Sequence, residues 1–166
     1  MADIQDELKE AVNAGDVDKV KTLIEEGADV NWQDDRLGTT VLMFCANLGS
    51  AELGKIIPMM IQAGLDPNMQ NLEGETALHM SAKGGNLGAA KLMIEAGADV
   101  NIVDSTGRTV CFYAAQNGLA ELIRLLLTDF DIDEHLCQLR IEPHLSAGLV
   151  CTTHKGHIVL PVLRCH

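Results

Sequence analysis

Apolar residues recur at helical spacing in short stretches that are separated by glycines. Between residues 87 and 96, Leu87, Met93 and Ile94 would lie on one face of a helix. Gly97 follows at once and can take the left-handed backbone conformation that ends a helix. The pattern therefore predicts a helix over 87–96.

A shorter helix is expected before it. The Thr76 hydroxyl can accept a hydrogen bond from the free N–H groups of a first helical turn. The small residues Ser81 and Ala82 allow a neighbouring helix to approach, and Gly85 ends the segment. The two helices would form a hairpin in which neither helix can bury its apolar face alone, so the hairpin must stack on others.

The same landmarks return at a fixed period. The string Gly-Ala-Asp-Val-Asn begins at Gly27 and again at Gly97, and a weaker copy begins at Gly64, 33 residues before Gly97. A second landmark, Gly-x-Thr, begins at Gly74 and Gly107, which are also 33 residues apart. Two registers with one period indicate a repeat array.

These landmarks resemble the ankyrin repeat, whose pattern is Asp-x-x-Gly-x-Thr-Pro-Leu-His-x-Ala-Ala, then Gly-His, an apolar helix and Gly-Ala-Asp-Val-Asn. Residues 74–82 match it best, and residues 104–115 follow it in the next unit. The resemblance covers residues 4–133. It implies an all-α solenoid of stacked helix-turn-helix units with short hairpin loops.

We therefore interpret residues 1–166 as a single ankyrin-repeat domain. Its expected parts are an N-terminal cap repeat at 1–33, a second repeat with an insertion at 34–70, a third at 71–103, a fourth at 104–136, and a degenerate fifth repeat or tail at 137–166. The charged first residues suit a unit whose outer side faces solvent.

The second unit departs most from the pattern. It has one extra residue at 34–37 and three more between its helices, because Gly49 and Gly64 are 15 residues apart where later units use 12. Alignment back from Gly64 places Pro58 near the first turn of the second helix, where a missing N–H is tolerated. We expect the insertion to form a bulge at 50–54.

The family's His, which braces neighbouring loops by hydrogen bonding, is present as His79. Met43 and Phe112 replace it in the second and fourth units. The loops of those two units are therefore expected to be less rigid.

The composition changes after Glu134, where five of the six histidines and three of the five cysteines lie. Gly156-His157 can be set against the Gly-His of the repeat, which favours a degenerate fifth unit. A non-repeat extension, or the start of a truncated segment, is the alternative. His154-x-x-His157 would place two imidazoles one helical turn apart, but only Cys151-x-x-His154 approximates the paired spacing of a structural zinc site, so no metal site is predicted.

The formal net charge is −12, and the first 133 residues hold nine Lys and Arg against 22 Asp and Glu. Such a surface repels phosphate backbones and anionic lipids, so neither nucleic acid nor a membrane is an expected partner. A protein partner with a basic patch would be attracted.

No apolar stretch approaches the roughly 18 residues of a spanning helix, and the N-terminus is acidic where a secretory signal is basic. We expect a cytoplasmic or nuclear protein with free thiols.

Motifs of catalysis are missing from the sequence, which contains neither Gly-x-Ser-x-Gly nor a phosphate-binding Gly-x-x-x-x-Gly-Lys. His79 matches the bracing His, so a structural role is expected for it. We predict a non-catalytic, monomeric protein without a cofactor.

The resemblance implies that a partner binds at the hairpin tips and on the exposed side of the first helices, which line a concave groove. The corresponding residues are Arg36, Leu37, Thr39, Leu72, Glu73, Glu75, Ser105, Thr106 and Arg108 at the tips, and Asn47, Leu48, Lys83, Gln116 and Asn117 on the helices.

Trp32, the single tryptophan, leads toward the first tip. It is either an interface anchor, a role in which Trp is enriched, or a side chain packed beneath the loop at 34–37. Leu37, Leu48 and Leu72 would form an apolar strip along the groove.

Two alternatives follow from the resemblance. Ankyrin-type inhibitors of cyclin-dependent kinases have similar length, but their second unit has a shortened first helix, whereas the insertion here predicts a longer unit. Family members are also hydroxylated on the hairpin Asn where Leu stands eight residues earlier. Asn31 meets that condition with Leu23.

Overall fold

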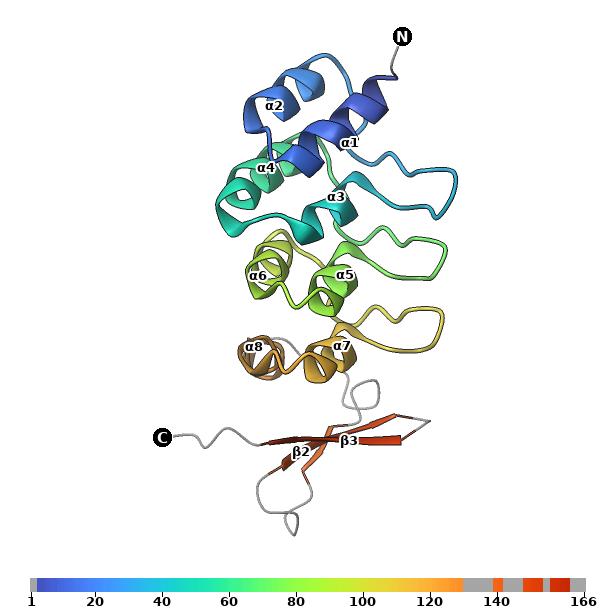
Figure 1. Cartoon of the computed structure of the whole chain (residues 1–166), viewed down its shortest axis with the longest axis vertical. Coiled ribbons are helices and arrows are strands. Elements are labelled where there is room, and N and C mark those ends of the chain that lie inside the picture. Colours follow the sequence, from blue (N-terminus) through green and yellow to red (C-terminus); the bar gives the residue numbers. More distant parts are fainter. Residues whose placement is uncertain (1–2, 130–138, 142–147, 154–155, 162–166) are drawn as a thin grey trace.

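The computed structural model describes residues 3–129, 139–141, 148–153 and 156–161. Residues 3–129 form a stack of helical pairs, with three loops that project from one side (Figure 1). The helical pairs are α1 (Ile4–Ala14) with α2 (Val17–Glu25), α3 (Val41–Phe44) with α4 (Ser50–Gln62), α5 (Ala77–Lys83) with α6 (Leu87–Glu95), and α7 (Val110–Gln116) with α8 (Ala120–Asp129). The helical solenoid expected for this part of the chain is confirmed.

The helices form two layers. The inner layer consists of α1, α3, α5 and α7, which lie next to the projecting loops, and the outer layer consists of α2, α4, α6 and α8 (Figure 1). The two helices pack on each other in the first, third and fourth pairs, and each helix of the first three pairs packs on the same-layer helix of the next pair. The core between the layers is aliphatic, with Leu53, Met60 and Met93 fully buried. Stacking thus buries the face that a single hairpin would expose.

The helix boundaries of the third unit follow its sequence signals. The Thr76 hydroxyl accepts a hydrogen bond from the N–H of His79 at the start of α5. The Asn86 side chain likewise accepts a hydrogen bond from the N–H of Ala89 at the start of α6. Gly97, two residues after the end of α6, has a φ of 91°. A side chain at that φ would be strained, so glycine ends the helix there.

The insertion in the second unit lengthens its outer helix, and the expectation of a bulge at 50–54 was wrong. Residues 50–54 are the first turn of α4, which has 13 residues against nine in α6. Pro58 is therefore the ninth residue of α4 and not part of its first turn. Pro58 and Gly54 are both exposed, so the Gly54 carbonyl that loses its helical hydrogen bond faces water.

The inner helix of the same unit is short. It comprises four residues and continues as the 3-10 turn η1 (Cys45–Asn47), whereas α5 and α7 have seven residues each. The sequence had suggested a unit with no shortened first helix. The extra residues instead lie in the outer layer.

The described residues after 138 are strands, which differs from the favoured interpretation of a helical fifth unit. They are β1 (Leu139–Ile141), β2 (Gly148–Thr153) and β3 (Gly156–Pro161). The strands form an antiparallel sheet in the order β1-β2-β3, in which Arg140 pairs with Val150 and Val150 with Val159. β3 lies next to α7 at the end of the stack. Runs such as Ile158-Val-Leu contain the β-branched residues that favour strands.

Candidate functional site

Each projecting loop ends in a turn that one polar side chain organises. Asp34, Asn71 and Asp104 occupy equivalent places, and the side-chain oxygen of each accepts two backbone N–H groups of its own turn. We call residues 34–39, 71–75 and 104–108 the hairpin tips. The first tip is one residue longer than the second, as expected, because Gly38 bonds back to Asp34 over four residues and Gly74 to Asn71 over three.

The three hairpin tips are bonded to one another. The N–H of Leu72 donates to the carbonyl of Leu37 at 2.9 Å, and the N–H of Ser105 donates to the carbonyl of Glu73 at 2.9 Å. The Gln33 amide also reaches the Gln70 carbonyl of the next unit at 3.0 Å. The tips therefore form a continuous row with a fixed spacing.

Asn31, the candidate hydroxylation site, joins the first two units. Its amide nitrogen donates to the Gly64 carbonyl and its oxygen accepts from the N–H of Asp66, both at 2.8 Å. Asn68 accepts from Asp99 in the same way at 2.7 Å. These asparagines thus act as braces between repeats.

Two exposed leucines are neighbours in the row of tips. The exposed fractions of Leu37 and Leu72 are 58% and 74%, which makes them the most exposed large apolar residues of the described chain. A Cβ on Gly38 would meet the Leu72 side chain at 3.5 Å, so Leu72 lies over Gly38. We call the pair Leu37 and Leu72 the tip patch.

Leu48 does not join the tip patch, in contrast to the expected three-leucine strip. It is half-buried against the core and lies near Gly15, at the turn between α1 and α2. Of the three leucines expected along the groove, only Leu37 and Leu72 are therefore exposed.

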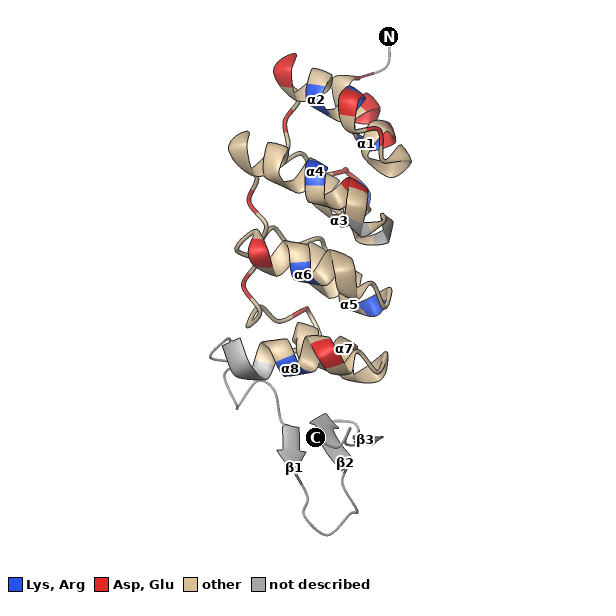
Figure 2. Ribbon diagram, turned by 90° about the vertical axis from the view of Figure 1, so that its left-hand side faces the viewer, with Lys and Arg blue, Asp and Glu red and all other residues tan. Residues whose placement is uncertain are grey.

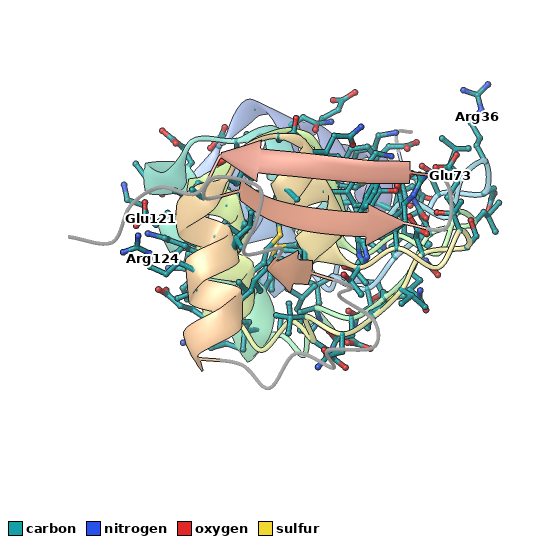
Figure 3. The ribbon with its side chains drawn as sticks, turned by 90° about the horizontal axis from the view of Figure 1, so that it is seen from below. Arg36, Glu73, Glu121 and Arg124 are labelled. Carbon is teal, nitrogen blue, oxygen red and sulfur yellow. The ribbon has the colours of Figure 1, made fainter. Side chains whose placement is uncertain are left out.

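The charged residues next to the tip patch point outward. Asp35, Arg36 and Glu73 are exposed. Seen along the stack, Arg36 and Glu73 lie at the hairpin edge of the molecule, opposite Glu121 and Arg124 of α8 (Figure 3). Thr39 and Glu75, also expected at the tips, are buried instead, so neither presents its side chain to solvent.

Glu75 is buried because it pairs with the inner helix of its own unit. Its carboxylate lies 2.5 Å from the ammonium of Lys83, which also sits over the ring of Tyr113 at 5.4 Å from the centroid. The hydrogen bond to Glu75 raises the pKa of Lys83. The corresponding positions of the second unit are occupied by Thr39 and Asn47 in the sequence.

Asp104 braces the fourth unit, and His79 ties the third unit to the fourth. Tyr113 donates its hydroxyl to Asp104 at 2.5 Å. Burial raises the pKa of Asp104, but the hydrogen bonds that the carboxylate accepts outweigh it and lower the pKa overall. His79 Nε2 lies 3.2 Å from the Arg108 carbonyl and Nδ1 lies 2.9 Å from the Thr76 hydroxyl. The bracing role expected of His79 is confirmed.

Burial lowers the pKa of His79, and the Arg108 carbonyl opposes that shift. A neutral ring that donates through Nε2 and accepts through Nδ1 satisfies both partners. The arrangement is that of a structural histidine.

Other cations of the inner layer lie on aromatic rings. Lys9 sits over Phe44 at 4.9 Å and Arg108 over Phe112 at 4.6 Å from the ring centroids. Gln116 is exposed, while the Asn117 amide donates to the carbonyls of Ala82 and Lys83. Most candidates on the inner helices are therefore committed to contacts within the stack.

Models of known families match two parts of the chain. "Ankyrin repeat" matches residues 8–35, and "Ankyrin repeats (3 copies)" matches residues 50–135, about half of the chain. The chain belongs to the ankyrin-repeat family. The matches leave out residues 36–49, which hold the longer first tip and the short α3 of the stack.

Curated relatives share the ankyrin part. The mouse protein named Ankyrin repeat domain-containing protein 40 is 29% identical over 79 residues, which are 48% of this chain and 21% of that protein. The cattle protein named Inactive serine/threonine-protein kinase TEX14 is 34% identical over 83 residues, which are 50% of this chain and 5% of that protein. The chain thus matches a small part of each relative's length.

The remaining candidates occupy varied positions on the ankyrin stack. Trp32 is half-buried and packs against the core, which agrees with the packing interpretation. Ser105 and Thr106 are exposed at the third tip. The side chain of Asn47 lies outside the described residues. Sequence reasoning missed the Gln33 and Gln70 bridges and the Tyr113 hydroxyl, although Gln stands two residues after both Asn31 and Asn68, which was a visible signal.

The outer layer presents a different surface. Basic residues of α2, α4, α6 and α8 lie in a column on the face seen in Figure 2. Several are paired: Lys21 lies 3.9 Å from Glu25, and Lys91 lies 2.5 Å from Glu121, whose pKa it lowers. Partly neutralised in this way, the column is an ordinary solvated helix surface.

The described residues also bear on metal and thiol chemistry. Cys45 and Cys111 are buried and form no disulfide, and burial raises the pKa of the Cys45 thiol to about 12. Such a thiol is inert as a nucleophile. No group of potential metal ligands occurs among the described residues, and the tail positions considered for metal lie outside those whose side chains are described.

Among the described residues, no helix combines the length and apolar character needed to cross a bilayer.

Proposed function

We propose that this chain is a non-catalytic interaction module that binds a protein partner through its hairpin tips and concave groove. Ankyrin repeats generally mediate protein–protein interaction. The single observation that carries the proposal is the tip patch. Two large aliphatic side chains lie exposed on neighbouring tips of a hydrogen-bonded row, and exposed apolar surface is typical of interaction sites.

The rigidity of the row supports this role. A binding surface whose backbone is already ordered loses less conformational entropy when a partner binds. The bonds from Leu72 to Leu37 and from Ser105 to Glu73 supply that order. The partner is proposed to bind a monomer.

Quantitative affinity purification with matched variants tests the proposal. The tip variant replaces Arg36, Leu37 and Leu72 by Ala. The control replaces Lys55 and Ile61 of the outer helix α4 by Ala, because these are also an exposed cation and an exposed aliphatic residue. Partners recovered by the unchanged chain should be lost with the folded tip variant and retained with the control. Equal recovery by all three chains would refute the assignment to the tips.

A second candidate is inhibition of a kinase. The short α3 of the second unit favours it, because the ankyrin-type inhibitors of cyclin-dependent kinases, which this chain resembles in length, have a shortened helix there. Purified chain in large molar excess should then slow substrate phosphorylation by such a kinase. Unchanged rates would exclude this candidate and leave the general proposal intact.

Hydroxylation of Asn31 stays a prediction. Both ends of its amide are engaged between the first two units, so modification would require local opening of the stack. Mass spectrometry of the cellular protein should find a mass increase of one oxygen on Asn31, and its absence would contradict the prediction.

A further inference from the structure

The tip patch consists of two leucine side chains, and this small extent limits the size of the partner group that can cover it. Leu37 and Leu72 are joined through the bond between their backbones, and Leu72 lies over Gly38. On the third tip the exposed residues are Ser105 and Thr106, which are polar. The apolar surface therefore ends after two tips and accommodates one large apolar side chain of a partner.

The charges around the patch are mainly negative. Asp35 of the first tip and Glu73 of the second are exposed, and neither forms an ion pair among the described residues. Asp34 adds a third carboxylate, whose pKa is lowered by hydrogen bonds, above all from the N–H of Leu37. Arg36 is the one cation of these two tips.

The nearby cations offset only part of this negative charge. Lys83 is paired with Glu75, whereas Lys9 and Arg108 lie over the rings of Phe44 and Phe112 and keep their charge. The whole chain carries a formal net charge of −12. A basic partner is therefore favoured both over a distance and in contact with the tips.

We infer that the tip patch binds a linear segment of a partner protein in which one large apolar residue is flanked by Lys or Arg. The apolar side chain covers Leu37 and Leu72, and the flanking cations pair with Asp35 and Glu73. This inference rests on the proposed function and specifies the chemistry of the partner.

Selection from a random peptide library displayed on phage tests it directly. The full chain is immobilised, and bound peptides are sequenced after several rounds. We expect enrichment of Leu, Ile, Met, Phe or Trp with Lys or Arg within two residues on each side. Enrichment of acidic peptides, or of none at all, would overturn the inference, while the affinity purification described above still tests the proposed function independently.

Affinities of a selected peptide for chain variants locate its contacts. Leu72→Ser should weaken binding at least about tenfold, because it removes most of one leucine's worth of buried apolar surface. Glu73→Lys should weaken binding by roughly fivefold to tenfold, and Arg36→Glu should strengthen it.

Glu95→Lys is the matched control for Glu73→Lys. Glu95 is an exposed carboxylate at the end of α6 in the outer layer, so its replacement changes the net charge equally without touching the tips. Its effect should be small and should vanish in high salt, where long-range attraction is screened. Equal losses for the two variants would overturn the contact with Glu73. Binding that is insensitive to Leu72→Ser but lost with Gln116→Lys would move the site into the groove, which leaves the proposed function standing.

Discussion

The second unit (residues 34–70) and the third (residues 71–103) share the landmarks of one repeat but are stabilised differently. Both inner helices begin at a Thr that caps the first turn, Thr40 or Thr76. In the third unit, His79 then reaches the Arg108 carbonyl of the next loop. In the second, Met43 stands at the His position and its sulfur accepts a weak bond from the N–H of Thr40 at 3.4 Å.

The outer helices of the two units also differ, and again the third unit has the more regular element. α6 has nine residues and no proline, whereas α4 has 13 residues with Pro58 in its interior. The comparison teaches that glycine and threonine landmarks set the spacing of the stack, while residues between them decide how firmly each unit is held. Both units share polar bonds with their neighbours, and the third adds the brace from His79 to the Arg108 carbonyl, which the second lacks.

The largest predicted effect breaks the contact between the second and third tips. Gly74 has a φ of 74°, and a Cβ there would lie 2.7 Å from the backbone nitrogen of Ser105. Gly74→Ala should destabilise the stack by about 3–4 kcal/mol, from backbone strain and from the clash. Guanidinium unfolding followed by circular dichroism measures the change.

Gly107→Ala is the control for Gly74→Ala. Gly107 has a φ of 76°, but nothing lies within 4 Å of the position of its Cβ. Its replacement should cost about 1–2 kcal/mol from strain alone. Equal losses for both variants would show that the tips do not approach each other closely.

A smaller effect of opposite sign should follow from Pro58→Ala. The change restores a helical N–H to α4 and removes a ring from its exposed side, which stabilises the folded chain. The entropy of the unfolded chain rises modestly, and this opposes part of the gain. We expect stabilisation of about 1–2 kcal/mol. Pro67→Ala, in the turn after α4, should not stabilise. A loss of stability with Pro58→Ala would mean that the proline is required by the shape of the second unit.

The smallest effect concerns the dependence of stability on pH. Because burial lowers the pKa of His79, folding favours its neutral form. Its contribution is complete above the ordinary value of 6.5 and is lost as the pH falls below it. The pKa values of Asp34 and Asp104 are lowered from the ordinary value of 3.8, so these two carboxylates affect stability only at lower pH, outside this window.

His79→Met, which copies the second unit, should lower stability at pH 7.5 and reduce its decline toward about pH 5.5. The other histidines are the same in both chains, so their contributions cancel. Thermal unfolding at several pH values provides the measurement. Parallel pH profiles for the two chains would argue against a buried neutral His79.

Local signals predicted the regular part of the fold. Thr76, Gly85 and Gly97 mark helix ends within a few residues, so α5 and α6 could be placed from the sequence. The spacing of Gly49 and Gly64 revealed extra residues but not which element holds them. Helix length in the second unit depends on packing against both neighbours, which no local pattern encodes.

The candidate site, like the fold, was predictable from the sequence only in part. Leu72 and Leu48 looked alike in the sequence, but Leu48 packs near Gly15 in the first unit, a contact between distant residues. Glu75 occupies a tip position and is nevertheless buried, because Lys83 lies within reach on the same unit. Such partners become visible only when the chain is folded.

Hydroxyl-radical footprinting of the chain with and without a bound partner tests the central claim most directly. The method oxidises exposed aliphatic side chains, and the described part of the chain has three large ones: Leu37 and Leu72 at the tips and Ile61 on α4. Partner binding should reduce oxidation of both leucines and leave Ile61 unchanged. Protection of Ile61 with undiminished oxidation of Leu37 and Leu72 would contradict the assignment of the hairpin tips as the binding surface.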